Sequence, residues 1–174
     1  MALRTIVTTP EPVLRRKAKT VTKFDENLQT LIDDMVETMR QAPGVGLAAP
    51  QVGVSERVIV VEYYENEEDE ESEEAEEAPK RLYTIVNPEI TRTSPDKEVA
   101  PEGCLSIPGV MGDVERHLAI TVKGQNRRGQ PVTLKLKDWT ARIFQHEIDH
   151  LNGVLFTDLA SRVWKPEGPI EDKV

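Results

Sequence analysis

Two histidines in the C-terminal part of the chain have the spacing of metal ligands. His146 and His150 lie four residues apart in QHEIDH, residues 145–150. In a helix they would project from one face, about one turn apart. Such a pair can bind one metal ion, and Glu147 beside it could hold a metal-bound water. The motif is short, however, so ordinary surface or core histidines beside an acid also explain it.

An open catalytic metal site needs a third protein ligand, with the fourth position left to water. The chain offers its third histidine, His117, and its one cysteine, Cys104. His117 follows Glu115 and Arg116 at the expected start of a strand. It is better interpreted as a residue at the rim of the fold than as a metal ligand. A lone cysteine is more often a buried small hydrophobe than a ligand. Cys104 is nevertheless the favoured third ligand, because the site needs one more donor and because Gly103 flanks the cysteine.

A third segment, GVGLAAPQVG at 44–53, combines glycines with small apolar residues and one amide. The glycines allow the backbone of a ligand to approach closely. Gln51, which follows the small apolar residues of this segment, could donate an N–H to a developing oxyanion. A phosphate-binding loop is excluded because no Lys-Ser/Thr pair follows the glycines. The segment alone is a weak signal.

Together, GVGLAAPQ, EGCLS and QHEIDH, in this order, resemble the three signature motifs of the peptide deformylase family. The similarity extends from EPVLR at 11–15 to NGVLF at 152–156, which is nearly the whole chain. The resemblance implies a metal-dependent hydrolase that removes the N-formyl group from the N-formylmethionine of newly synthesised proteins and releases formate. It also implies a mixed α+β fold in which antiparallel sheets flank the helix with the HExxH motif.

The resemblance further implies a ligand set and a metal. The implied metal ligands are Cys104, His146 and His150. One divalent ion is expected, Fe²⁺ first, with Zn²⁺, Ni²⁺ or Co²⁺ able to occupy the site. A thiolate ligand makes the ion softer and less Lewis-acidic than a third imidazole would.

The remaining roles are also implied by matching motif positions. Glu147 matches the catalytic acid/base. Gln51 matches the oxyanion donor, together with the backbone N–H of Leu105. In the family, the substrate main chain pairs with the enzyme like an added strand. The positions that match this pairing are Val45, Gly46 and Gly103.

Two other functions stay open at this point. An HExxH motif with a metal hydrolyses amides generally, so a metallopeptidase is one alternative, although no third distal histidine follows. A catalytically inactive, peptide-binding relative is the other, although none of the matching site residues is missing. Cleavage of an unformylated peptide would distinguish the first alternative, and loss of turnover in Glu147→Gln would exclude the second.

The chain also departs from the family pattern. Met111 occupies the position, seven residues after Cys104, where some members carry an arginine that contacts the carboxyl end of the substrate. The long C-terminal helix of many bacterial members is not expected here. Transient association with the ribosome is therefore in doubt, whereas N-formylmethionyl nascent peptides remain the expected partners.

The elements that must position these residues follow from hydrophobic periodicity. A short helix is expected at 13–19 after two prolines. Asp25 is the expected N-cap of an amphipathic helix ending near Gln41. The apolar residues of this helix recur at offsets of three and four, which predicts one buried face; they are Leu28, Leu31, Ile32, Met35 and Met39.

Strands and a second helix complete the predicted fold. The run 57–62 predicts a buried strand, and 82–87 predicts its neighbour, closed by Pro88. A second strand pair is expected at 119–124 and 132–137. Asp138 should cap a helix over 139–151 that ends at Asn152-Gly153. The predicted class is α+β, with antiparallel sheets around a central HExxH helix and a second amphipathic helix near the N-terminus.

Composition limits the class of protein. The chain has 174 residues and a net charge of −9, but 11 of its 31 acids lie between Glu62 and Glu77. Without them 20 acids face 22 bases, so the acidity belongs to one segment. We expect a single domain over 1–174, with a solvated acidic insertion at 63–80 and an irregular tail from about 159. An electrostatic docking arm for a basic partner is the alternative function of the insertion.

Several classes of protein are excluded. The longest aliphatic run, 58–61, is far too short to cross a membrane, and the N-terminus lacks the apolar stretch of a secretory signal. One cysteine cannot form an internal disulfide, which suits a reducing compartment. Scattered basic residues give no support for a sequence-specific nucleic-acid platform. We therefore expect a cytoplasmic monomer.

Overall fold

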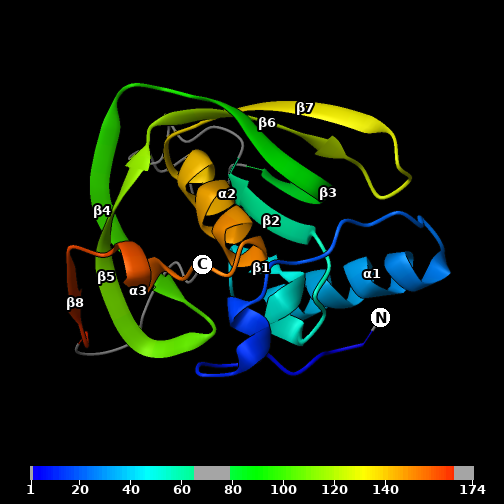
Figure 1. The fold of residues 1–174 in the computed structure, drawn as a ribbon, viewed down its shortest axis with the longest axis horizontal. Helices are drawn as coiled ribbons and strands as arrows, with labels where there is room; N and C mark the ends of the chain where they lie inside the picture. Colours follow the sequence, from blue (N-terminus) through cyan, green and yellow to red (C-terminus); the bar gives the residue numbers. More distant parts are fainter. Residues whose placement is uncertain (1, 65–78, 167–174) are drawn as a thin grey trace.

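The computed structural model describes residues 2–64 and 79–166 (Figure 1). It has the predicted α+β class, with antiparallel sheets and helices. The elements in chain order are η1 (Pro12–Arg15), α1 (Glu26–Gln41), β1 (Gly46–Ala48), η2 (Ala49–Val52), β2 (Val58–Tyr64), β3 (Lys80–Thr93), β4 (Lys97–Cys104), β5 (Ile107–His117), β6 (Ala119–Gln125), β7 (Pro131–Lys137), α2 (Asp138–Leu151), α3 (Phe156–Leu159) and β8 (Arg162–Trp164).

The described strands form two antiparallel sheets. The larger sheet has the order β1-β2-β3-β6-β7, and the smaller one has the order β4-β5-β8. Figure 1 shows α2 between the strands of the larger sheet and the long curved ribbon of β4 and β5. Since β1 and β4 are each paired on one side only, each presents an edge among the described residues.

Strand β2 separates two hydrophobic cores. Ile59 and Val61 pack in the core that contains the apolar face of α2, whereas Val58 and Val60 pack in the core of α1. Successive side chains of a strand point to opposite faces, so a strand covered on both faces becomes a continuous apolar run. All four side chains are fully buried. Burial of each stabilises the fold by roughly 1.5–3 kcal/mol.

The N-terminal amphipathic helix is confirmed. Asp25 caps α1 by accepting a hydrogen bond from the Leu28 backbone N–H at 3.1 Å, and the helix ends at Gln41. The predicted apolar stripe is buried in its entirety; its members are Leu28, Leu31, Ile32, Met35 and Met39. Helix α1 therefore covers the larger sheet on the face opposite to α2.

Helix α2 ends as predicted but begins differently. Lys137 is its N-cap residue, and Asp138 is the first helical residue with a φ of 54°. The prediction that Asp138 caps the helix with its side chain is therefore wrong. At the other end the chain leaves the helix at Asn152, and Gly153 has the left-handed φ of 75°. A left-handed residue after a helix favours glycine because it lacks a Cβ.

Tertiary contacts change other predicted boundaries. The helix expected at 13–19 is only the 3-10 turn η1, because Ala18 and Lys19 are held in an extended segment by backbone bonds to Leu151 and Ser55. Strand β3 does not close at Pro88. It continues past Pro88 through a register shift between Val86 and Glu89, which accommodates a residue that cannot donate to the ladder.

The chain after residue 159 was also predicted incorrectly in part. Residues 162–164 form β8 and pair with Met111, Gly112 and Asp113 of β5, so this part of the tail is not irregular. Strands β2 and β3 form the expected hairpin around the acidic insertion. The ends of the predicted insertion belong to β2 and β3, while its residues 65–78 lie outside the described part of the chain.

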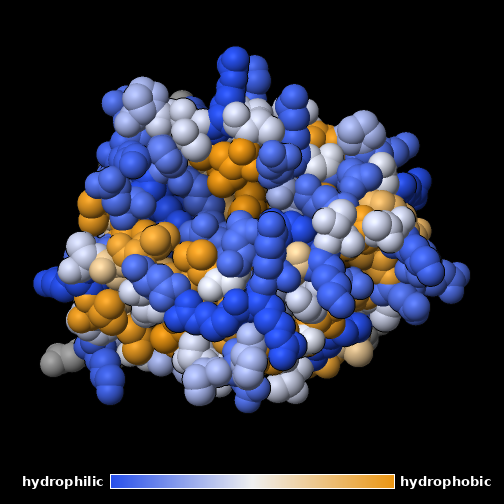
Figure 2. All heavy atoms as spheres, in the orientation of Figure 1, coloured by the Kyte–Doolittle hydropathy of each residue, from blue (hydrophilic) through white to orange (hydrophobic). Residues whose placement is uncertain are grey.

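The face seen in Figure 2 is mainly polar, and apolar side chains gather over α3 and β8 as well as in smaller areas elsewhere. Leu159 of α3 and Val163 of β8 are each 48% exposed. Within residues 2–64 and 79–166, no helix is long and apolar enough to cross a membrane.

Candidate metal centre and active site

Three metal-ligating side chains converge at the end of β4 and on α2. Donor atoms of Cys104, His146 and His150 all lie within 4.8 Å of one another. The Cys104 Sγ is 3.3 Å from the His150 Nε2, which is 3.2 Å from the His146 Nε2. All three residues are buried. One thiolate and two imidazoles form a donor set that fits a divalent transition metal.

Local structure explains this convergence. His146 and His150 lie one turn apart on α2, as their spacing predicts. Cys104 is the last residue of β4, at a register shift that begins after Gly103. Helix α2 keeps its aliphatic residues toward the larger sheet, so the histidines point toward β4; the buried aliphatic and aromatic residues are Ile143, Phe144, Ile148 and Leu151, as predicted.

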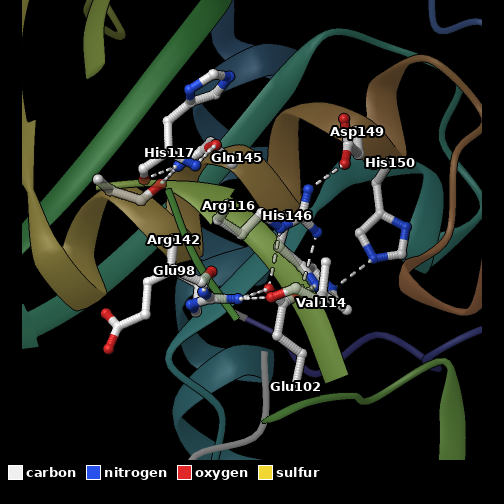
Figure 3. A network of polar contacts seen from close by, with 11 residues as sticks. Glu98, Glu102, Val114, Arg116, His117, Arg142, Gln145, His146, Asp149 and His150 are labelled. Atoms are coloured by element: carbon white, nitrogen blue, oxygen red, sulfur yellow. Dashed lines mark hydrogen bonds and ion pairs between the residues drawn. The ribbon is translucent and has the colours of Figure 1, made fainter. Parts of the chain in front are cut away.

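Glu102 fixes the orientation and protonation of His146. The His146 Nδ1 lies 2.8 Å from the Glu102 Oε1 (Figure 3). An ionised carboxylate can only accept hydrogen bonds, so Nδ1 must donate. In the neutral imidazole, the form that can bind a metal, the lone pair of His146 is therefore on Nε2, the nitrogen that faces His150. On the other side of the ring, Phe156 stacks on His146 with a centroid distance of 6.1 Å.

His146 and two arginines bind the carboxylate of Glu102 inside the protein. Burial would raise the pKa of Glu102, but hydrogen bonds from His146 and Arg116 outweigh it and hold that pKa far below its ordinary value. Arg116 binds both carboxylate oxygens at 2.9 and 3.0 Å, and Arg142 binds Oε2 at 2.6 Å. Charged partners on both oxygens offset much of the cost of burying this carboxylate.

Burial and the neighbouring charges shift the pKa values of the two histidines in opposite directions. Burial would lower the pKa of His146, yet its bonds to Cys104 and Glu102 raise that pKa to about 10. Burial and the neighbouring His146 lower the pKa of His150 well below its usual value. The surroundings therefore favour a proton on His146 and disfavour one on His150.

Glu147 is completely buried, and no described residue forms a hydrogen bond with its carboxylate. Neither of its carboxylate oxygens is paired within the described structure. Burial is the main cause that raises the pKa of Glu147 to about 7. A Cβ on Gly46 would lie 2.5 Å from the Glu147 Oε2, so the glycine leaves room for this carboxylate. Unpaired buried oxygens are costly unless another group, such as a water, is bound there.

Gln51 is held with its amide nitrogen toward the donors. Its Oε1 accepts from the Ala48 backbone N–H at 2.9 Å, which fixes the carboxamide orientation. Its Nε2 donates to the Ser106 Oγ at 3.1 Å and lies 3.6 Å from the Cys104 Sγ. Gln51 is fully buried. The structure therefore brings this predicted residue to the metal centre.

The remaining predicted residues lie on or next to the edge strands β1 and β4. Gly46 belongs to β1 and pairs with Val61, while Val45 precedes it and packs on the core of α2. Gly103 belongs to β4, and Leu105 follows Cys104 in the turn to β5.

His117 is not part of this centre. It is the last residue of β5, not the first of a strand, and its Nδ1 lies 2.8 Å from the Ser94 carbonyl oxygen. Among the described residues the cluster able to hold a metal consists of Cys104, His146 and His150. The preference for Cys104 over His117 as the third donor agrees with this geometry.

Sequence reasoning missed the charged residues behind the donors, which are Glu102, Arg116 and Arg142. Glu102 offered a signal, because it stands in EGCLS two residues before Cys104. The two arginines offered none. They lie 14 and 40 residues from Glu102 in the chain, and only the fold brings them to it.

An α+β fold with paired helical histidines, a thiolate donor and a buried free carboxylate is the arrangement of a metal-dependent amide hydrolase. A sequence model described as Polypeptide deformylase matches residues 3–165. The chain belongs to this family, which confirms the resemblance of the three motifs. The family is metal-dependent, and its function is removal of the N-formyl group from newly synthesised proteins.

Individual relatives agree with this assignment. The peptide deformylase of Desulforudis audaxviator is 48% identical over 165 residues, which is 95% of this chain and 98% of the relative. The crystal structure of peptide deformylase from Thermotoga maritima has a TM-score of 0.82 and 46% identity, covering 93% of this chain and all of that one. The structure from Ehrlichia chaffeensis in complex with actinonin has a TM-score of 0.83 and 40% identity, covering 93% and 91%.

Proposed function

We propose that this chain hydrolyses the formyl amide of N-formylmethionyl peptides, and that Cys104, His146 and His150 hold the required metal ion. The observation that carries the proposal is the pair of unpaired, buried Glu147 oxygens beside three convergent donor atoms. When bound, the divalent metal supplies a Lewis acid that lowers the pKa of water and polarises a carbonyl oxygen. The soft thiolate donor is compatible with Fe²⁺, and also with Zn²⁺, Ni²⁺ or Co²⁺.

Glu147 is the proposed acid/base. Its carboxylate takes a proton from the attacking water and later gives it to the amine nitrogen that leaves the formyl carbon. Formate and a free peptide N-terminus result. A catalytic group is most effective with a pKa near the working pH, and burial raises the pKa of Glu147 to about 7.

Gln51 and Leu105 are the proposed oxyanion donors. The Gln51 carboxamide is locked by Ala48 and Ser106, so its nitrogen needs no reorientation when charge develops. The backbone N–H of Leu105 follows Cys104 directly. One such donor is typically worth about 3 kcal/mol of transition-state stabilisation.

The substrate main chain is proposed to lie as an added strand beside β1. Gly46 and Val45 supply one side, and Gly103 on β4 supplies the other. Edge strands present backbone groups that can pair with another chain. In this arrangement α2 is central, and each of the two sheets presents one edge to the peptide.

Formate release from N-formyl-Met-Ala-Ser tests the function. Metal-loaded protein should release formate from this peptide and leave unformylated Met-Ala-Ser intact. Cleavage of the Met-Ala bond in the unformylated peptide would instead establish a peptidase. Binding of both peptides without release of formate would establish a peptide-binding relative. Anaerobic loading with Fe²⁺, Zn²⁺, Ni²⁺ or Co²⁺ in parallel would rank the metals.

We further propose that the protein acts as a cytoplasmic monomer on nascent peptides. A single cysteine that serves as a reduced thiolate ligand supports a reducing compartment. Sedimentation velocity would test the monomer. Cosedimentation with ribosomes at low salt, with and without residues 65–78, would test ribosome association.

A further inference from the structure

The charged network behind His146 contains two arginines that make different contacts. Arg116, on β5, binds both oxygens of Glu102 and also Asp149. Arg142, on α2, binds one of the two Glu102 oxygens, Oε2, which is the oxygen that His146 does not use. Figure 3 shows the carboxylate between the two guanidinium groups, with His146 beside it.

Arg142 also binds backbone groups of both strands that lead to the metal centre. Its Nη1 donates to the Val114 carbonyl oxygen on β5 at 2.9 Å, and its Nη2 donates to the Glu98 carbonyl oxygen on β4 at 2.7 Å. The guanidinium carbon lies 5.6 Å from the centre of the Trp139 ring. Arg142 is only 4% exposed, so water does not compete for these contacts.

The location of Arg142 connects the two halves of the donor set. It lies four residues before His146, which places both side chains on one face of α2. Two of its acceptors, Glu98 and Glu102, belong to β4, the strand that ends at Cys104. Arg142 thus joins the helix that carries two donors to the strand that carries the third.

We propose that Arg142 is a positioning residue for the metal centre. It aims Glu102 at the His146 Nδ1 and fixes α2 against β4, so that both Nε2 atoms face the Cys104 Sγ. The inference rests on the proposed metal ligands, but its test measures metal binding and is independent of formate release. Lysine cannot replace the arginine, because a compact ammonium group lacks the planar fork that reaches acceptors on two strands.

The test compares Arg142→Lys and Arg142→Gln with a control, Arg127→Met. Arg127 is a suitable control because it also joins a helix to a strand turn, through Gln29 and Asp33, without contacting the metal centre. The affinity for Co²⁺ would be measured by competition with a chelator, and the visible spectrum of the Co²⁺ form would report the donor geometry. Urea unfolding of each apoprotein would report stability separately.

Both Arg142 variants should bind Co²⁺ about 10–100-fold more weakly and show an altered spectrum, as outer-shell substitutions do at metal sites. The KM for N-formyl-Met-Ala-Ser should stay within about twofold, because Arg142 is buried and its guanidinium group is occupied by Glu102 and two backbone carbonyl groups. Arg127→Met should be less stable yet retain both Co²⁺ affinity and spectrum. Unchanged affinity and spectrum in the Arg142 variants would overturn the proposal. Failure of both to fold would also overturn it, because the role would then lie in folding.

Discussion

Gly46→Ala should disturb catalysis through a single contact with Glu147. The added Cβ would lie 2.5 Å from the Glu147 Oε2 and 3.0 Å from both Cδ and Cγ of the same side chain. Because Glu147 is completely buried, its carboxylate cannot move into solvent to avoid the methyl group. Either β1 or the carboxylate must move, and both belong to the proposed catalytic site.

The magnitude follows from the size of the overlap. To reach even a tight contact of 3.0 Å the two atoms must separate by 0.5 Å. Overpacking of this kind typically costs about 1–3 kcal/mol of stability. A catalytic group misplaced by about 1 Å can lose a factor of about 10² in rate. We therefore expect kcat to fall by roughly 10–100-fold, with metal content unchanged because the three atoms nearest the new Cβ belong to Glu147 and not to Cys104, His146 or His150.

A double-mutant cycle identifies the responsible contact. Truncation of Glu147 to alanine removes all three atoms that the new Cβ meets. Gly46→Ala should therefore destabilise the wild-type protein by about 1–3 kcal/mol but have little effect on Glu147→Ala. Urea unfolding of the wild type, both single variants and the double variant measures this difference.

Additive free energies of unfolding would refute the reasoning. If the double variant lay within about 0.5 kcal/mol of the sum of the single variants, the two residues would not be coupled. The cost of Gly46→Ala would then come from the backbone of β1.

Three further predictions concern stability. Asp25→Ala removes the N-cap bond to Leu28 and should lower the free energy of unfolding in urea by about 1 kcal/mol. A hydrogen bond from the Ala2 backbone N–H and another from the Arg4 side chain lower the pKa of Asp34. A carboxyl group with a depressed folded-state pKa stabilises the fold above its unfolded pKa of about 4 and loses this contribution as the pH falls. Asp34→Asn should thus be less stable than wild type at pH 7, and the difference should shrink below about pH 4; a constant difference would contradict the assignment. Chelation of the metal should lower the thermal midpoint by an amount that depends on free metal concentration, and a midpoint insensitive to added metal would argue against the centre.

The convergence of Cys104, His146 and His150 was predictable because cysteine and histidine are rare in this chain. One cysteine and three histidines leave few combinations, and the four-residue spacing of His146 and His150 specifies one helical face. Glu147 and Gln51 came with the same motifs. Helix α1 was predictable for a similar reason, since its apolar stripe has a single period and Asp25 is an ordinary cap.

Strands β4 and β5 were missed because their composition is typical of loops. Pro101, Gly103, Pro108 and Gly109 interrupt any alternating pattern. Moreover, Arg116 points into the protein beside Val114, where sequence reasoning expects an apolar residue. Such a position becomes favourable only when the fold provides Glu102 as partner, which no local pattern can indicate.

The C-terminal elements show the same limit. Strand β8 has only three residues, and its pairing with β5 spans about fifty residues of sequence. The 3-10 turn η1 ends at Arg15 because the following residues bond to the end of α2. In both places long-range contacts, not local propensity, decide the structure.

Glu147→Gln tests the central claim most directly, because glutamine keeps the size of the side chain but cannot take up the proton. The measurement pairs metal content with formate release from N-formyl-Met-Ala-Ser. The account predicts about one metal ion per chain together with loss of turnover. Formate release at the wild-type rate by the metal-loaded variant would contradict the assignment of Glu147 as the acid/base.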